Sequence, residues 1–266
     1  MSKSAAFFDL DKTVIAKSSV LAFGRPFYQG GLINRRAVLK SSYAQFVYLV
    51  SGADEEQMDR MRAYLTQLCR GWEVEQVKQI VEETLHDLID PIIYEEAAAL
   101  IEEHRAAGRD VVIVSSSGEE VVEAIGRLLG VDDVIATRMV VEDGRYTGEV
   151  AYYAAGPEKA TAIRELAMVR GYDLDTCYAY SDSITDVPML AAVGHPTAVN
   201  PDRALRRVAA ERGWPALVFR RPVTLRSRFP QFRRPSTPVL AGVLGIGLAA
   251  AGFALYERHR RRSFGA

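Results

Sequence analysis

Apolar and polar positions follow two different rhythms along the chain. Short apolar runs, typical of strands buried on both faces, occupy residues 5–8, 110–118, 132–138, 176–183, 196–200 and 216–219. Between these runs apolar residues recur every three or four positions, which predicts helices over residues 92–107, 119–129, 158–170 and 202–211. Residues 140–151 alternate around Asp143-Gly144, a pattern typical of a β-hairpin. Strands that alternate with helices predict an α/β fold built on a doubly wound, mostly parallel sheet.

Residues 17–90 break this rhythm. They contain helical repeats and no strand of comparable quality; one predicted helical face is formed by Val74, Val77, Val81 and Leu88. We expect a helical cap inserted after the first strand and placed above the carboxyl edge of the sheet. Residues 1–16 and 91–219 would then form the α/β core.

The C-terminal part of the chain has a third character. Arg and Pro dominate residues 220–237, which predicts a linker. Residues 238–256 contain no charged side chain, and a helix of this length spans roughly 28 Å, close to the ~30 Å hydrocarbon core of a bilayer. Arg residues flank this segment on both sides, and residues 257–266 form a basic tail. We expect a single-pass helix in the inner membrane with the body in the cytoplasm; a helix packed against the body is the alternative.

Charge is distributed unevenly around a formal net charge of −1. Residues 203–266 hold 14 Arg and no Lys, with Glu211 and Glu257 as the acids. An Arg-rich tail can bind nucleic acid, but the apolar segment inside it favours a membrane surface, so we expect no nucleic-acid partner. Cys69 and Cys177 lie far apart, which does not suggest a disulfide framework or a zinc site.

Two carboxylates, Asp9 and Asp11, stand one residue apart where the first apolar run ends. Residues i and i+2 at the end of a strand point the same way, so both carboxylates would face one site. Close carboxylates stay ionised only beside a cation, or they share a proton; the pair therefore suggests Mg²⁺, which prefers oxygen ligands. A capped turn with a solvated acidic pair is the structural alternative.

Three further features fall at strand ends or helix starts. The second predicted strand ends in "VSSSGE", which places the Ser115 hydroxyl and backbone N–H groups at the start of a helix. Lys159 stands in the first turn of a helix, where the dipole disfavours a cation. Asp182 and Asp186 follow the fourth predicted strand. Each has an ordinary structural alternative, an N-cap or a surface lysine, but their coincidence in this order indicates one site for a phosphoryl group.

With these motifs in order, residues 4–219 resemble the haloacid dehalogenase-like superfamily, in the branch typified by phosphoserine phosphatase. The family's four motifs match Asp9, Asp11 and Thr13; Ser115; Lys159; and Asp182 with Asp186. The resemblance implies a Rossmann-like core and Mg²⁺-dependent hydrolysis of phosphomonoesters through an aspartyl-phosphate.

The resemblance also implies a role for each matched residue. Asp9 would be the nucleophile and Asp11 the general acid and base. The phosphate would be held by Thr13, Ser115, Ser116 and Lys159. Mg²⁺ would be bound by Asp9, the backbone carbonyl of Asp11 and Asp182, while Asp186 would act through water or orient Lys159.

Two positions depart from the family's pattern. Ser18 stands where phosphoserine phosphatases carry a Glu that reads the substrate's amino group, and Thr185 replaces an amide in the fourth motif. The substrate therefore stays open between a phosphorylated small molecule and a lipid phosphate such as lysophosphatidate or phosphatidylglycerophosphate. A non-catalytic module that binds a phosphorylated ligand is a rival from another class. The sequence leaves the oligomeric state open.

Overall fold

A computed structural model describes residues 3–33 and 66–220 of the chain. The predicted linker beyond Arg220, the predicted span 238–256, the basic tail and residues 34–65 of the predicted cap lie outside the described residues. Within the described residues, no helix is long and apolar enough to cross a membrane. The chain divides into two compact units, residues 1–225 and 226–266, and the first holds every described residue.

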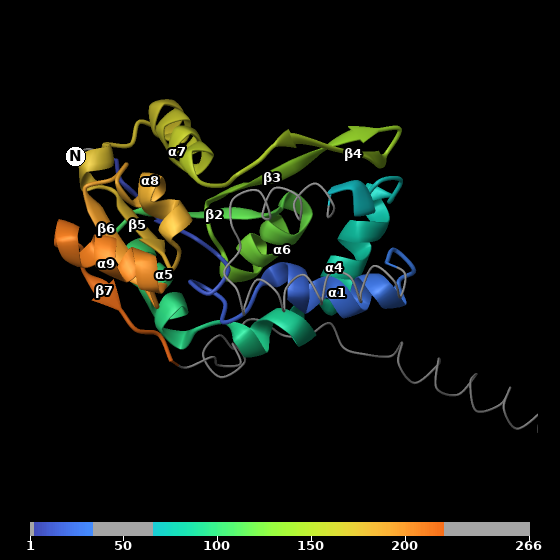
Figure 1. Cartoon of the computed structure of the whole chain (residues 1–266), viewed down its shortest axis with the longest axis horizontal. Helices are drawn as coiled ribbons and strands as arrows, with labels where there is room; N and C mark the ends of the chain where they lie inside the picture. The colour runs from blue at the N-terminus through green and yellow to red at the C-terminus, as the bar shows by residue number, and fades with distance from the viewer. Residues whose placement is uncertain (1–2, 34–65, 221–266) are drawn as a thin grey trace, which may run out of the picture. The chain divides into compact units, whose positions relative to one another are not determined.

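A seven-stranded sheet with the strand order β4-β3-β2-β1-β5-β6-β7 forms the centre of the fold (Figure 1). Its strands are β1 (Ala5–Phe8), β2 (Asp110–Gly118), β3 (Asp133–Glu142), β4 (Arg145–Tyr152), β5 (Tyr178–Ser181), β6 (His195–Val199) and β7 (Ala216–Leu217). All neighbouring pairs are parallel except β3 and β4. The mostly parallel α/β sheet predicted from the sequence is thus confirmed.

The predicted hairpin is confirmed, and it is longer than expected. β3 runs on from the sheet into the hairpin without a break, and the chain reverses at Asp143 and Gly144, whose φ angles of 48° and 74° suit a tight two-residue turn. The tip reaches the start of the helix at Val74, where the Val74 N–H donates to the Gly144 carbonyl at 3.0 Å.

Helices cover both faces of the sheet. The helices are α1 (Ser19–Gln29), α4 (Val74–Ile89), α5 (Glu95–Ala106), α6 (Glu119–Leu129), α7 (Pro157–Arg170), α8 (Val187–Leu190) and α9 (Arg203–Arg212), with short 3-10 turns η1 (Asp90–Ile92), η2 (Leu174–Thr176) and η3 (Ile184–Asp186). α7, α8 and α9 share a buried cluster with Phe7 and Val112 of the sheet. On the other face, Phe8 contacts His104 of α5 and stacks on Tyr180. Coverage of both faces explains the unbroken apolar runs of the central strands.

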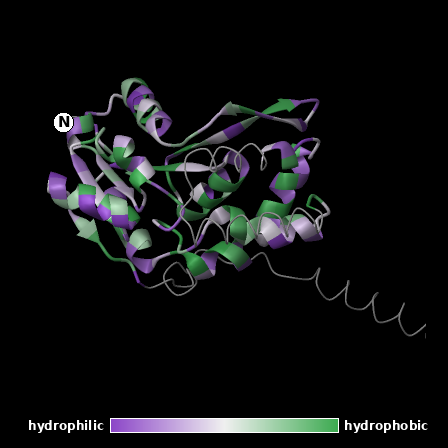
Figure 2. Cartoon of the chain, viewed as in Figure 1, coloured by the Kyte–Doolittle hydropathy of each residue, from purple (hydrophilic) through white to green (hydrophobic). Residues whose placement is uncertain are grey.

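Between β1 and α5 the described residues form α1, α4 and the short turn η1, and α1 packs against α4. Along α4 the buried residues are Val77, Val81, Leu85 and Ile89, and Figure 2 shows the matching alternation of hydrophobic and hydrophilic segments on these helices. The buried face differs from the predicted one, because Leu88 lies at its edge and Leu85 takes its place. The limits of the cap as a domain, residues 17–90, stay a prediction.

Candidate active site

The acidic residues predicted from the sequence meet at the carboxyl ends of two adjacent strands. Asp9 follows β1 directly, and its N–H donates to the Tyr180 carbonyl of β5 at 2.9 Å. Asp182 follows β5 directly. Because β1 and β5 are parallel neighbours, their carboxyl ends bring Asp9 and Asp182 to the same edge of the sheet.

Lys159, in the first turn of α7, bonds two of the carboxylates at this edge. Its Nζ donates to Oδ1 of Asp9 at 2.7 Å and to Oδ2 of Asp186 at 2.8 Å. Asp186 also accepts the Ser181 hydroxyl at 2.7 Å. Lys159 and Asp186 are each only 3% exposed, so both ion pairs are buried. We call Asp9, Lys159 and Asp186 the buried charge cluster.

Burial and repulsion between carboxylates raise the pKa values of the acids at this edge. Burial raises the pKa of Asp9 to about 8; the Lys159 ammonium opposes the rise, and Asp186 and Asp182 add to it. Burial likewise raises the pKa of Asp182 to about 7, against the effect of Lys12. Burial disfavours the charge on Lys159, but Asp9 and Asp186 outweigh it and the pKa of Lys159 rises. The edge therefore carries more negative than positive groups.

Asp11 is held separately, on the side of the inserted helix α1. Its Oδ1 accepts the backbone N–H of Ser19 at 2.9 Å, and its Oδ2 faces the Ser117 hydroxyl at 3.4 Å. The hydroxyls of Ser19 and Ser117 lie 2.7 Å apart. Burial raises the pKa of Asp11, and these hydrogen bonds partly offset the rise. Ser19 and Ser117 were not predicted as site residues; for Ser117 the signal was its two-residue spacing from Ser115.

The residues expected to bind phosphate differ in their surroundings. Thr13 is fully buried, and its hydroxyl has no hydrogen-bond partner among the described residues. Ser115 is 1% exposed, and its hydroxyl accepts the Ser117 N–H at 3.2 Å. Ser116 is exposed, and its carbonyl accepts the Thr137 hydroxyl at 2.8 Å. An unpartnered buried hydroxyl is uncommon and marks Thr13 as a place where a polar ligand atom would be accommodated.

Asp202 secures the loop that carries Asp182 and Asp186. It stands just before α9, and its Oδ1 accepts the Leu205 N–H at the start of that helix at 2.7 Å. Its Oδ2 also accepts the Ile184 N–H at 2.9 Å, and its own N–H donates to the Asp182 carbonyl at 2.8 Å. These second contacts, which the sequence did not indicate, fix the backbone between the two acids.

The oxygen donors at this edge fit a hard divalent cation. The predicted ligands are the carboxylates of Asp9 and Asp182 and the carbonyl of Asp11, all oxygens of the kind Mg²⁺ prefers. Over residues 3–33 and 66–220, no group of three or more His, Cys, Asp and Glu side chains is arranged to hold a metal. The predicted set uses only two side chains, and the excess of negative charge around them suits a cation.

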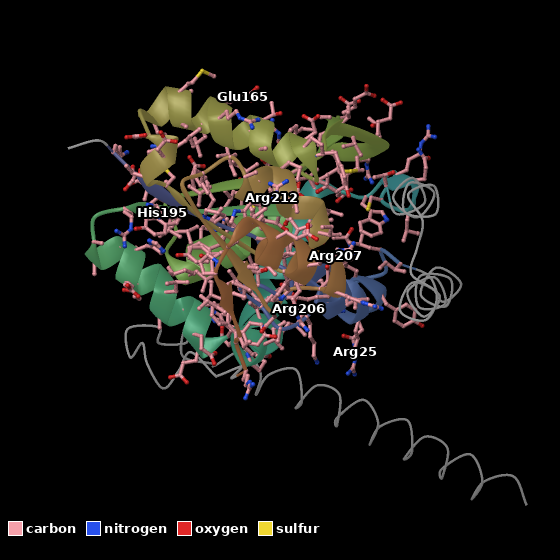
Figure 3. All side chains as sticks on the ribbon, turned by 60° about the vertical axis from the view of Figure 1, so that its left-hand side comes forward. Arg25, Glu165, His195, Arg206, Arg207 and Arg212 are labelled. Carbon is pink, nitrogen blue, oxygen red and sulfur yellow. The ribbon has the colours of Figure 1, made fainter. Side chains whose placement is uncertain are left out.

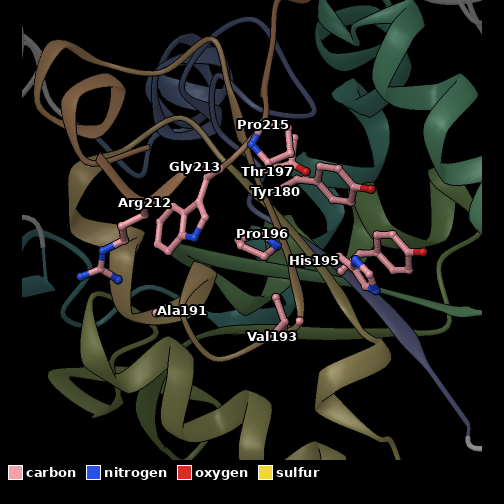
Figure 4. A pocket seen from close by; sticks show the side chains of 12 residues that line it. Tyr180, Ala191, Val193, His195, Pro196, Thr197, Arg212, Gly213 and Pro215 are labelled. Atoms are coloured by element: carbon pink, nitrogen blue, oxygen red, sulfur yellow. The ribbon is translucent and has the colours of Figure 1, made fainter. Parts of the chain in front are cut away.

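A cavity of about 570 Å³ lies away from these residues, beside β5, β6 and the end of α9. Figure 4 shows His195 and Arg212 among its lining residues. His195 begins β6 and pairs in register with Tyr178, the first residue of β5. The cavity is therefore at the amino ends of the strands, opposite the edge that carries Asp9 and Asp182.

Several arginines of α1 and α9 are exposed at the surface of the protein. Arg25, Arg206, Arg207 and Arg212 are exposed, and Figure 3 shows them at the surface. Arg25 belongs to the described part of the predicted cap, whereas Arg35, Arg36, Arg60 and Arg62 of the cap lie outside the described residues.

In a doubly wound sheet ligands bind at the carboxyl edge, and there Lys159 places a fixed positive charge among carboxylates, an arrangement that suits a phosphoryl group. The sequence model of the haloacid dehalogenase-like hydrolase family matches residues 6–191. The chain belongs to this family, in its phosphoserine-phosphatase-like branch, and it is a phosphatase.

Sequence similarity to known proteins extends over most of the chain. The "inhibition of morphological differentiation protein" of Streptomyces azureus is 70% identical over 262 residues, covering 97% of this chain and 95% of that protein. A probable phosphatase of Mycobacterium tuberculosis is 60% identical over 264 residues, covering 98% and 91%. A phosphoserine phosphatase of the same species is 35% identical over 219 residues, covering 82% and 71%.

Solved structures share the fold. A protein of unknown function from Bordetella pertussis Tohama I superposes with a TM-score of 0.72 at 28% identity, covering 82% of this chain and 99% of that one. A substrate-bound phosphoserine phosphatase has a TM-score of 0.60 at 20% identity, covering 88% of this chain and all (100%) of that one. The family that the motifs indicated is thus confirmed, and the rival reading as a non-catalytic binding module is set aside.

Proposed function

We propose that the protein is a Mg²⁺-dependent phosphomonoester hydrolase that transfers the phosphoryl group to Asp9 and then to water. The buried charge cluster carries this proposal. A lysine that is 3% exposed and bonded to two carboxylates supplies a fixed positive charge at the point where a phosphoryl group would meet Asp9. The family membership and the phosphatase relatives support it.

Asp9 performs the nucleophilic step. An oxygen of its carboxylate attacks phosphorus in line, the bond from phosphorus to the alcohol oxygen breaks, and an aspartyl-phosphate results. Lys159 holds Oδ1 of Asp9 at 2.7 Å, which restricts rotation of the carboxylate. Attack requires the ionised form, which burial disfavours at Asp9, so positive charge nearby is needed.

Asp11 handles the protons. It would donate a proton to the departing alcohol oxygen and then accept one from the water that attacks the aspartyl-phosphate. Burial, which raises the pKa of its carboxyl group, favours the protonated form that the first step needs. A second carboxylate close to the nucleophile is explained by this role.

The remaining residues hold charge and orientation. Thr13, Ser115, Ser116 and Lys159 would bind the phosphoryl oxygens, and Asp186 orients Lys159, to which it is bonded at 2.8 Å. Asp9, the Asp11 carbonyl and Asp182 would hold Mg²⁺, which offsets the charge of the nucleophile and the phosphate when bound.

We propose a phosphorylated small molecule as the substrate. The phosphoserine phosphatase among the relatives supports this class. Ser18 replaces the carboxylate with which that branch reads an amino group, so we do not assign phosphoserine itself. A lipid phosphate would rest on the Arg-rich linker beyond Arg220 and on residues 238–256, which lie outside the described residues.

We also propose, from the sequence pattern alone, that residues 238–256 attach the protein to the inner membrane with the body in the cytoplasm. Removal of residues 235–266 should then shift the protein from the membrane pellet to the supernatant on fractionation. Unchanged sedimentation with membranes would contradict the proposal.

The catalytic proposal is tested with p-nitrophenyl phosphate, an aryl ester that does not depend on substrate recognition. We expect turnover with Mg²⁺, its loss in EDTA, and at least about a thousandfold lower kcat for Asp9→Asn. Asp175→Asn, an exposed aspartate in η2, is the matched control and should retain activity. Equal activity of Asp9→Asn and wild type would refute the role of Asp9.

A further inference from the structure

We propose that the hydroxyls of Ser19 and Ser117 are positioning groups that aim the Asp11 carboxyl at the leaving-group oxygen. The inference rests on the proposed role of Asp11 as general acid. We call Ser19 and Ser117 the serine pair.

The serine pair is buried and comes from two different parts of the fold. Ser19 is 0% exposed and Ser117 is 5% exposed. Ser19 is the first residue of α1, in the segment inserted after β1, whereas Ser117 stands near the end of β2, 98 residues further along the chain. Their hydroxyls nevertheless lie 2.7 Å apart, so the pair joins the inserted helix to the sheet beside Asp11.

Each oxygen of Asp11 has its own partner. The Ser19 N–H donates to Oδ1 at 2.9 Å, and the Ser117 hydroxyl donates to Oδ2 at 3.4 Å. A carboxyl group turns easily about its terminal bond, and two donors on opposite oxygens stop that rotation. The backbone donor persists whatever side chain stands at position 19. Hydrogen bonds from the side chains of both serines also lower the pKa of Asp11, so the side-chain control of Asp11 falls to the serine pair.

The Ser19 hydroxyl also acts through Ser117. A hydroxyl has one proton to donate; when Ser117 donates to Asp11, the 2.7 Å contact is completed by Ser19 donating to Ser117. Without the Ser19 hydroxyl, Ser117 loses the partner that turns its proton toward Asp11. The two side chains therefore act as one unit, and loss of either should have nearly the same effect.

This role makes a prediction that depends on the leaving group. An alkyl alcohol leaves as an alkoxide unless it is protonated, so cleavage of an alkyl phosphate needs a well-aimed acid. The p-nitrophenolate ion is stable without a proton, so its ester hardly needs one. Misaiming Asp11 should lower turnover of the alkyl ester selectively, whereas a general loosening of the site would lower both.

The test compares kcat for glycerol phosphate and p-nitrophenyl phosphate, with Mg²⁺ present, in variants at position 117. Thr and Val have the same shape, and only Thr keeps the hydroxyl, so Ser117→Thr and Ser117→Val isolate the hydroxyl even if Ser117→Ala does not fold. Relative to Ser117→Thr, we expect Ser117→Val to lose about ten- to a hundredfold on the alkyl ester and less than about threefold on the aryl ester. Ser19→Ala combined with Ser117→Ala should cost no more than the worse single change.

Thr176→Ala is the matched hydroxyl deletion. Its hydroxyl bonds the Asp173 carbonyl in η2, at the amino end of β5, so the ratio of the two activities should not change. Equal losses on both esters, full additivity of the two serine changes, or no loss at all would overturn the inference while leaving the proposed function standing. Absence of turnover of both esters by the wild-type protein would overturn both.

Discussion

Replacement of Lys159 by Met removes the positive charge from the buried charge cluster while keeping a side chain of similar length. In the folded protein Asp9 and Asp186 would then be buried without the ammonium that bonds both at 2.7 and 2.8 Å. Removal of one partner from a buried ion pair costs about 3–5 kcal/mol, and two hydrogen bonds to charged groups, at about 1.5–3 kcal/mol each, give a similar range of about 3–6 kcal/mol. We expect the free energy of unfolding to fall by about 3–5 kcal/mol.

The loss should also depend on pH. The pKa of Asp9 already lies above its ordinary value, and without Lys159 it should rise further. A carboxyl group whose pKa is raised by folding binds more protons in the folded state than in the unfolded state. The free energy of unfolding therefore falls as pH increases toward the folded-state pKa. The variant should therefore be destabilised more at pH 9 than at pH 6.

Urea denaturation in EDTA at these two pH values measures both effects, because EDTA removes any divalent cation that would replace the ammonium. Lys78→Met is the control: Lys78 is exposed on α4 and pairs with Glu75, so its replacement should cost less than about 0.5 kcal/mol. If Lys159→Met is as stable as the wild type, or if its loss is the same at pH 6 and pH 9, the reasoning about the buried charge cluster is wrong.

Two further predictions concern the body of the fold. His104 accepts the Arg109 N–H at Nδ1 at 2.7 Å and contacts the Tyr180 hydroxyl at 2.8 Å, and burial lowers its pKa to about 4, with Arg109 adding to the effect. The unfolded chain therefore binds more protons than the folded chain between pH 6.5 and 4. The free energy of unfolding should fall by up to about 3 kcal/mol as pH drops through that range. Over the same range the urea midpoint of His104→Gln should fall less than that of the wild type. At Gly194 an added methyl group would collide with the Asp175 carbonyl, so Gly194→Ala should lower the thermal midpoint by the equivalent of about 1–3 kcal/mol. Gly24→Ala, where an added methyl meets nothing within 4 Å, should not lower it, and equal midpoints for the two alanine variants would contradict this reading of Gly194.

The sheet and the order of its elements follow from sequence pattern because each central strand is buried on both faces and each helix on one. Ala5–Phe8 and Asp110–Gly118 are apolar runs at the centre of the sheet, and the turn at Asp143-Gly144 has a conformation that few other residue pairs adopt. The positions of the strand ends then determine where Asp9 and Asp182 lie. Asp9 and Asp182 fall at one edge because parallel neighbours share their direction.

Contacts between side chains that are far apart in the sequence could not be predicted from the pattern of apolar and polar positions. A Ser has the same local preferences whether its hydroxyl faces water or another hydroxyl, so the 2.7 Å contact of Ser19 with Ser117 could not be inferred from either segment. On the predicted face of α4, Val77 and Val81 are buried as expected, but Leu85 is buried in place of Leu88. Both leucines suit an apolar stripe, and tertiary packing selects Leu85. The helix predicted over residues 202–211 is present as α9, but the bond that Asp202 accepts from the Ile184 N–H depends on the fold.

The most direct test of the account is to locate the phosphoryl group on the protein. Asp11→Asn, which lacks the base for the second step, is mixed with p-nitrophenyl phosphate and Mg²⁺, quenched in acid, digested and analysed by mass spectrometry. One phosphoryl group is expected on the peptide that contains Asp9, and none when Asp9→Asn is added. A phosphoryl group on another residue, or turnover by wild-type protein with no phosphorylated peptide at any quench time in the variant, would contradict it.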